Sequence, residues 1–194
     1  MTRINISHRK ILVFCPNWVG DVVMATPAFD CLRQNFPEAR MIAVIREYAR
    51  GVIEDGLWFD QIIECRDKSL QEFMGTVRTI RRLKPDLAVV LPNSFRSALL
   101  ARLGGVGQIC GYCRNGRTML LTGGPIPLRS GSDWLPIPMT RYYLELCRWL
   151  KLRIPESPRP RLFFSEAMQT RSQKLLEHYG IASGDLVIGL NPGA

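Results

Sequence analysis

The chain has 194 residues, of which 46% are hydrophobic and 22% are charged. This composition is typical of a folded globular protein and excludes a collagen-like, wholly disordered or membrane-embedded chain. Lysine and arginine number 26 against 17 acidic residues, so the formal net charge is +9. Such an excess favours an anionic partner, namely nucleic acid, a membrane surface or a phosphorylated substrate; a basic surface that only aids solubility is the alternative.

Short apolar runs alternate with helical patterns along the chain. The predicted strands are 10–15, 40–45, 60–64, 86–91 and 108–112. The predicted helices are 19–36, 69–84, 94–103, 140–151 and 166–179. Pro27 is expected to kink the first helix or to end a first short piece of it. The alternation and the short connections predict an α/β fold, a doubly wound parallel sheet covered on both faces.

A domain boundary is predicted at residue 155, because the stretch from Ile154 to Pro160 carries three prolines and is the best linker candidate. Residues 186–190 (LVIGL) have the composition of a buried strand, which needs neighbouring strands and a helix. We therefore expect residues 1–154 to form one domain, and residues 155–194 to hold a linker and the start of a truncated second domain. The alternative is a one-domain protein whose last strand joins the sheet.

The first polar cluster, residues 16–21 (PNWVGD), follows the first predicted strand. Open α/β sheets bind ligands at the carboxyl ends of their strands. Gly20 permits a ligand to approach the backbone closely. Asp21 falls in the first turn of the next helix, where the helix terminus stabilises negative charge. Its carboxylate suits a base for a hydroxyl that becomes acidic only as the new bond forms, whereas the alternative is an aspartate that only caps the helix.

Two further clusters follow later strands. Asn93, Ser94 and Arg96 offer an amide, a hydroxyl and a guanidinium to an anion, with an ordinary helix cap by Ser94 and a solvated Arg96 as the alternative. Arg114 and Arg117 flank an Asn-Gly turn that can grip an anion, with a plain solvated turn as the alternative.

Several classes of function lack their signatures. Cys110 and Cys113 have CxxC spacing, but a structural zinc site usually needs a second pair of ligands, so no metal is expected. Neither GxGxxG nor GxxxxGK[ST] is present, and no nucleic-acid-binding motif supports nucleic acid as the partner. No apolar run approaches the ~20 residues of a membrane span, and the first residues lack a signal-peptide core. We therefore expect a cytoplasmic protein.

Three segments together resemble one family, the bacterial lipopolysaccharide heptosyltransferases, and within it most nearly the heptosyltransferase II branch. They are residues 17–28 (NWVGDVVMATPA), 91–106 (LPNSFRSALLARLGGV) and 111–122 (GYCRNGRTMLLT). The final residues 188–194 (IGLNPGA) are similar to the start of that family's donor-binding domain, although the chain ends before the lysine that normally follows.

The resemblance implies the N-terminal, acceptor-binding half of a GT-B glycosyltransferase with two Rossmann-like domains. It implies an inverting transfer of heptose from ADP-heptose to heptosyl-Kdo–lipid A, with Asp21 as the general base and no cofactor. The implied partners are the lipopolysaccharide inner core, ADP-heptose through the missing domain, and the inner face of the inner membrane, where the protein is peripheral. The alternative is a non-catalytic domain that binds anionic glycolipid and no donor.

The same resemblance, combined with the clusters above, assigns the remaining candidate residues. The expected donor-binding residues are Gly20, Gly193 and Ala194. The expected acceptor-binding residues are Asn17, Asn93, Ser94, Arg96, Arg114 and Arg117.

Overall fold

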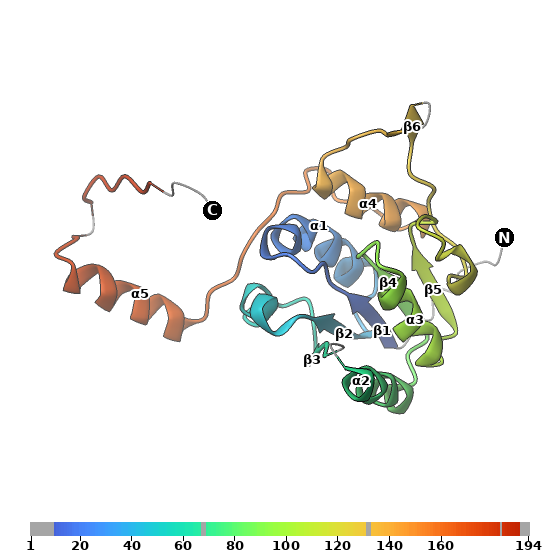
Figure 1. Cartoon of the computed structure of the whole chain (residues 1–194). Helices are drawn as coiled ribbons and strands as arrows, with labels where there is room; N and C mark the ends of the chain where they lie inside the picture. The colour runs from blue at the N-terminus through green and yellow to red at the C-terminus, as the bar shows by residue number, and fades with distance from the viewer. Residues whose placement is uncertain (1–9, 67–68, 131–132, 183, 191–194) are drawn as a thin grey trace. The chain divides into compact units, whose positions relative to one another are not determined.

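The computed structural model describes residues 10–66, 69–130, 133–182 and 184–190 (Figure 1). The chain divides into two compact units, Met1–Leu162 and Phe163–Ala194.

A parallel five-stranded sheet forms the centre of the first unit. Its strands are β1 (Lys10–Phe14), β2 (Arg40–Ile45), β3 (Gln61–Glu64), β4 (Leu87–Val90) and β5 (Gln108–Gly111). They lie in the order β3-β2-β1-β4-β5, and every neighbouring pair is parallel. The predicted α/β fold is confirmed, and the five predicted strand segments all pair. Because the strand order reverses between β1 and β4, the sheet has its topological switch point there.

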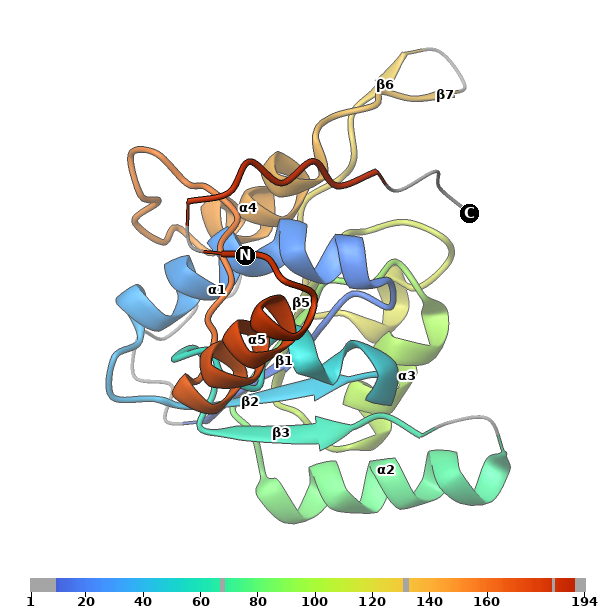
Figure 2. The same ribbon diagram turned by 90° about the vertical axis from the view of Figure 1, so that its left-hand side faces the viewer.

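Helices cover both faces of this sheet. They are α1 (Val19–Asn35), α2 (Leu70–Leu83), α3 (Phe95–Leu103) and α4 (Met139–Trp149), with the short helices η1 (Glu47–Val52) and η2 (Thr118–Leu120). Helices α1 and α4 pack together on one face, and α2 and α3 on the other (Figures 1 and 2). Leu12 and Phe14 belong to the apolar cluster under α2 and α3. Since side chains alternate along a strand, the equally buried Ile11 and Val13 face α1 and α4.

Helix α1 continues through Pro27, so the helix does not end there, which was one of the two expected effects of this proline. A proline has no N–H to donate to the carbonyl four residues earlier, here that of Val23. The hydroxyl of Thr26 donates to this carbonyl instead, at 2.8 Å. A neighbouring side chain thus replaces the missing backbone donor, and the helix continues.

The start of α2 matches its prediction closely. Ser69 is the N-cap, its hydroxyl accepts from the amide of Glu72, and the Glu72 carboxylate accepts from the amide of Ser69 at 3.0 Å. This reciprocal pair satisfies two otherwise free donors of the first turn.

The second unit holds helix α5 (Glu166–His178), which Ser165 caps. Residues 186–190 form no strand, contrary to prediction. Leu186, Ile188 and Leu190 are 91%, 76% and 89% exposed, and no described residue pairs with this stretch as a strand. An apolar run becomes a strand only where another strand satisfies its backbone, so composition alone did not decide this segment. Residues 186–190 also add no strand to the five-stranded sheet, which was the alternative. The domain boundary at residue 155 and the nature of the second domain stay predictions.

None of the helices in the described part of the chain combines the length and the apolar character that a membrane crossing requires.

The Thr26 hydroxyl is predicted to stabilise α1, because Pro27 cannot donate a hydrogen bond to the Val23 carbonyl. Thr26→Val should lower the free energy of unfolding by about 1–3 kcal/mol, because the Val23 carbonyl loses its donor. In Thr26→Val/Pro27→Ala the new amide at position 27 supplies that donor, so the double variant should lose less than the sum of the two single variants. Urea denaturation of all four proteins measures this coupling, and strict additivity would contradict the account.

Asp60 is predicted to make stability depend on pH. Burial works to raise the pKa of its carboxyl, but hydrogen bonds from Arg33 and from the amide of Met41 outweigh burial and leave the pKa below its usual 3.8. This stabilisation is present above about pH 4 and is lost as the pH falls through the folded-state pKa.

Asp60→Asn should therefore cost about 1 kcal/mol at neutral pH and close to nothing in strong acid, a small value because the side chain is 47% exposed. Glu38→Gln, a change at an exposed position, is the control. Equal losses at both pH values would contradict the assignment.

Candidate functional site

The segments that follow β1, β4 and β5 all leave the same edge of the sheet, because parallel strands share one carboxyl edge. This edge carries the three polar clusters on which the sequence analysis concentrated. The three clusters lie at one edge of the sheet, as the sequence predicts. Some of their side chains are exposed and can meet a ligand, whereas others are buried and bonded within the protein.

Asp21 lies in the first turn of α1, beside the switch point, and its side chain is partly exposed. Trp18, not Asp21, occupies the N-cap and makes no side-chain cap hydrogen bond. Burial raises the pKa of the Tyr143 phenol on α4, and the negative charge of Asp21 raises it further. Gly20 is exposed on the same turn, with nothing within 4 Å of where a Cβ would be.

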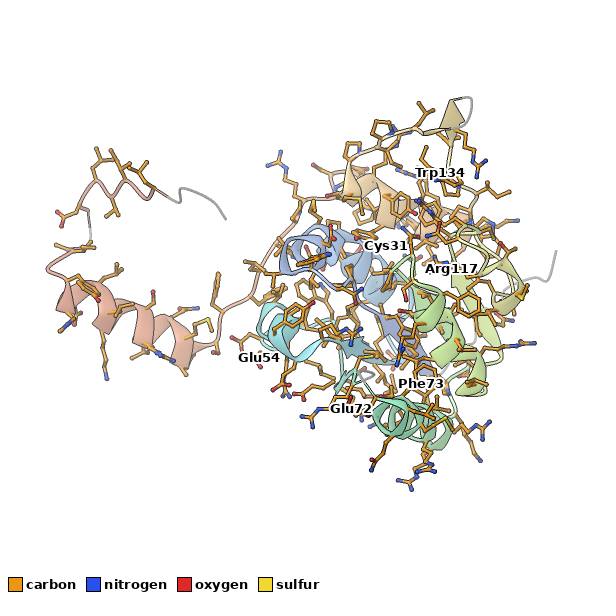
Figure 3. All side chains as sticks on the ribbon, in the orientation of Figure 1. Cys31, Glu54, Glu72, Phe73, Arg117 and Trp134 are labelled. Atoms are coloured by element: carbon orange, nitrogen blue, oxygen red, sulfur yellow. The ribbon has the colours of Figure 1, made fainter. Side chains whose placement is uncertain are left out.

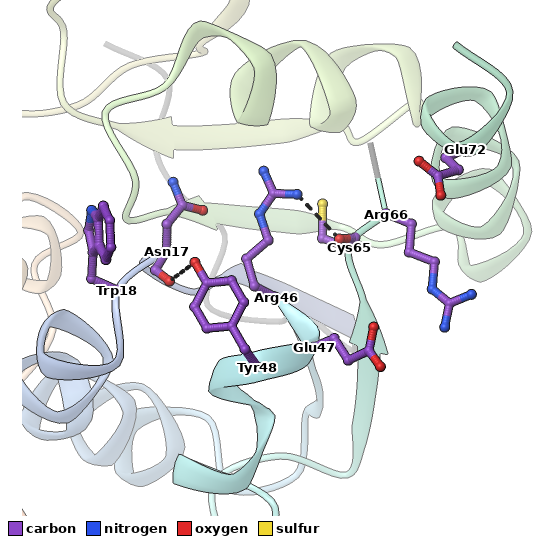
Figure 4. Close-up of a pocket in the computed structure, with 8 residues that line it drawn as sticks. All are labelled: Asn17, Trp18, Arg46, Glu47, Tyr48, Cys65, Arg66 and Glu72. Carbon is purple, nitrogen blue, oxygen red and sulfur yellow. Dashed lines mark hydrogen bonds between the residues drawn. The ribbon is translucent and has the colours of Figure 1, made fainter. Parts of the chain in front are cut away.

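A pocket of about 660 Å³ opens at the carboxyl ends of β1, β2 and β3 (Figure 4). The Tyr48 hydroxyl donates to the Asn17 carbonyl at 2.6 Å, and Arg46 donates to the Cys65 carbonyl at 3.4 Å, which joins the three loops. The pocket is lined by Asn17, Trp18, Arg46, Glu47, Tyr48, Cys65, Arg66 and Glu72.

The lining combines exposed aromatic rings with charged groups of both signs. Trp18 is 74% and Tyr48 63% exposed, so both rings offer surface to a ligand. Glu72 is committed to the cap of α2, and Arg66 lies 3.3 Å from Glu64. Such a wall suits a polar ligand with apolar ring faces, as sugars have.

Of these lining residues, the sequence analysis singled out only Asn17 as a binding candidate. Ligands bind at the carboxyl ends of the strands in open α/β sheets, and this holds for β2 and β3 as well as for β1, β4 and β5. Arg46 follows the last residue of β2 directly, and Cys65 and Arg66 follow β3, so the same rule identifies them.

Arg117 does not have the exposed position that was predicted for an anion-binding residue of its loop. Its side chain is fully buried (Figure 3) and donates to the carbonyls of Tyr112, Pro92 and Ser94 and to Oδ1 of Asn93. Burial lowers the pKa of its guanidinium. The guanidinium therefore holds the segments after β4 and β5 together and is not open to an anion.

Asn93 and Ser94 belong to the same interior network. Oδ1 of Asn93 accepts from Arg117 at 3.2 Å and from the hydroxyl of Tyr142 at 3.0 Å. The Ser94 hydroxyl accepts from the amide of Ser97 at 3.2 Å and caps α3, which is the alternative that the sequence left open. Both residues thus have structural roles at this edge.

The other two arginines are more accessible. Arg96 is exposed, with its guanidinium 5.0 Å from the centre of the Phe73 ring. Arg114 is half-buried, lies 4.7 Å from the Trp134 ring, and donates to Asn115. Gly193 and Ala194 lie outside the described residues.

The cysteines offer no metal centre among the residues that the structure describes, since no three His, Cys, Asp or Glu side chains cluster there. Cys110 is buried, which raises the pKa of its thiol, and Cys113 donates to the carbonyl of Gly124. The two cysteines of the CxxC pattern, Cys110 in β5 and Cys113 just after it, are therefore free thiols.

Curated relatives are lipopolysaccharide and lipooligosaccharide heptosyltransferases. Lipopolysaccharide heptosyltransferase 2 of Escherichia coli is 25% identical over 192 residues, which is 95% of this chain and 54% of the relative. Lipooligosaccharide heptosyltransferase 2 of Haemophilus ducreyi is 28% identical over 137 residues, or 69% of this chain and 38% of the relative. The predicted resemblance is confirmed, and the chain spans about half or less of these relatives. No family model matches the chain.

Solved structures agree on the fold. A glycosyl transferase family 9 protein from Veillonella parvula superposes with a TM-score of 0.78 at 18% identity, over 95% of this chain and 53% of that protein. The E. coli ADP-heptose LPS heptosyltransferase II superposes with a TM-score of 0.68 at 24% identity, over 90% of this chain and 51% of that protein.

Removing the buried fork of Arg117 is predicted to destabilise the first unit strongly. A lysine has no planar fork and cannot reach four acceptors on two segments, so Arg117→Lys should lower the free energy of unfolding by about 2–4 kcal/mol. Arg102→Lys on the exposed side of α3 is the matched control and should change it by less than about 0.5 kcal/mol. Equal effects in urea denaturation would show that the burial of Arg117 has no energetic role.

Proposed function

We propose that this chain supplies the acceptor-binding half of a heptosyltransferase, which transfers heptose from ADP-heptose to the heptosyl-Kdo–lipid A inner core of lipopolysaccharide. One observation carries the proposal: the likeness to E. coli lipopolysaccharide heptosyltransferase 2 extends along 95% of the chain. The site at the carboxyl edge supports it, because its residues are suited to a polar acceptor. On this proposal the overall architecture is GT-B, and the donor is bound largely by a second domain.

Asp21 is the proposed general base. In an inverting transfer the acceptor oxygen attacks the anomeric carbon while the bond from that carbon to the diphosphate of ADP breaks. The acceptor proton passes to the Asp21 carboxylate as the new bond forms, and ADP leaves with the bonding electron pair. A carboxylate is a weak base towards a resting alcohol but suits one whose acidity rises during the reaction. Its place beside the switch point puts it where open α/β sheets bind ligands.

Arginines of the carboxyl edge are proposed to bind the acidic acceptor. Kdo carboxylates and lipid A phosphates are anions, and arginine forks recognise both kinds of group. Arg96 is exposed, and Arg46 and Arg66 line the pocket beside Asn17. Arg114 is a further candidate, whereas the buried Arg117 acts only by holding the edge in shape.

The donor and the membrane complete the proposal. Gly20 leaves open space on the first turn of α1, where a diphosphate can approach the backbone. Gly193 and Ala194 are proposed to contact the same donor. A net charge of +9 favours a peripheral position on the anionic cytoplasmic face of the inner membrane.

Asp21→Asn is predicted to lower the rate of heptose transfer by about 10²–10⁴-fold, because the amide cannot accept the proton. Transfer of labelled heptose from ADP-heptose to heptosyl-Kdo–lipid A, by the protein that carries this chain, measures the change. Glu38 precedes β2, at the opposite edge of the sheet. Glu38→Gln is therefore the control, and its rate of transfer should equal that of the parent.

Thermal unfolding of Asp21→Asn should match the parent, which separates lost chemistry from lost folding. Near-normal transfer would remove Asp21 from the mechanism. Binding of the acceptor without any binding of ADP-heptose would favour the alternative of a non-catalytic glycolipid-binding domain.

A further inference from the structure

A small antiparallel pair of strands projects from the first unit beyond α4. The strands are β6 (Arg129–Ser130) and β7 (Asp133–Trp134), and Figures 1 and 2 both show them standing away from the sheet. The amide of Leu135 donates to the carbonyl of Leu128 at 3.0 Å and extends the pairing by one position. We call residues 126–129 and 134–135 the hairpin arms.

The two faces of the hairpin arms differ in chemistry. Arg129 is paired with Trp134, and Leu128 lies opposite Leu135 at the next position. Since side chains alternate along strands, the leucine pair lies on the face opposite to the arginine and tryptophan. Leu128 is 64% and Leu135 44% exposed, and the preceding Ile126 is 75% exposed. One face of the projection is therefore an exposed aliphatic surface.

The other face attaches the hairpin to the edge that carries the candidate site. The guanidiniums of Arg129 and Arg114 both lie over the Trp134 ring, at 3.8 and 4.7 Å from its centre. Arg114 lies in the segment that follows β5 at the carboxyl edge of the sheet. These contacts leave Trp134 half-buried and turn the leucine face away from this attachment.

We propose that the hairpin arms insert into the interface of an anionic lipid bilayer. Exposed aliphatic side chains on one face of a thin hairpin, with an exposed arginine and a tryptophan on its other face, suit the boundary between acyl chains and acidic headgroups. Arginine can bury its aliphatic stem and keep its charge at headgroup level. The net charge of +9 complements such a surface.

A lipid surface fits these arms better than a second protein does. A stable protein interface buries about 800 Å² on each partner, far more than strands of two residues supply. A bilayer needs no complementary shape and accepts a few protruding side chains. The inference rests on the proposed function only for its purpose, which is to bring the carboxyl edge to a lipid-linked acceptor; lipid binding itself follows from the arms.

The test is flotation of the 194-residue chain with vesicles of phosphatidylcholine alone or mixed with phosphatidylglycerol. Leu128→Ser/Leu135→Ser should weaken partition into the mixed vesicles by about tenfold or more, because both aliphatic groups lose their transfer free energy. Arg129→Gln should weaken it about fivefold at low salt and less at high salt. Leu57→Ser, at an 80% exposed position outside the arms, is the matched control and should bind as the parent does.

Five outcomes would overturn the proposal. The first four are no binding to mixed vesicles, equal binding by the double serine variant and the parent, equal loss in the Leu57→Ser control, and a lipid-free dimer that the double serine variant abolishes. Loss in Leu186→Ser with none in the arms would place lipid contact on the second unit and overturn it as well. Circular dichroism of each variant checks folding. No outcome depends on heptose transfer, so failure here and failure of the proposed function are distinguishable.

Discussion

All five strands of the sheet run in one direction, and this constraint decides where the chain can do chemistry. Each strand delivers the residues that follow it to the same edge, and the reversal of order between β1 and β4 separates the two halves of that edge. Asp21, the pocket residues and the exposed Arg96 reach this edge from different parts of the sequence. The sheet thereby assembles a polar surface that no single segment contains.

The edge is held in shape by a buried positive charge, the guanidinium of Arg117, which donates to carbonyl oxygens. Arg117 is satisfied by three backbone carbonyls and by Asn93, which in turn accepts from Tyr142 on α4. Tyr142 also stacks on Tyr112, with ring centroids 3.8 Å apart. This network joins β4, β5 and α4, so the positions of the exposed groups around it depend on interior hydrogen bonds.

The sequence predicted what depends on local pattern. Apolar runs located the five strands of the parallel sheet, and the helices predicted to begin at residues 69 and 94 have Ser69 and Ser94 as their N-caps. It failed where a distant or backbone partner decides the outcome: carbonyls that carry no sequence signal enclose Arg117, and a hydroxyl compensates for Pro27. Residues 186–190 show the same limit, since an apolar run is a strand only when another strand lies beside it. Arg46 and Tyr48 after β2 and Arg66 after β3 are predictable from the sequence, because they follow predicted strands and ligands bind at the carboxyl ends of strands.

The central claim is that the carboxyl edge binds an acidic sugar acceptor. The most direct measurement is a titration of the isotopically labelled chain with a lipid-free heptosyl-Kdo fragment, followed by the shifts of backbone amide resonances in NMR spectra. The account predicts shifts concentrated at residues 17–21, 46–48 and 94–97, with the α5 helix unaffected. Shifts confined to another surface would contradict the account. So would the absence of any shift at a fragment concentration that saturates a lipopolysaccharide-processing enzyme.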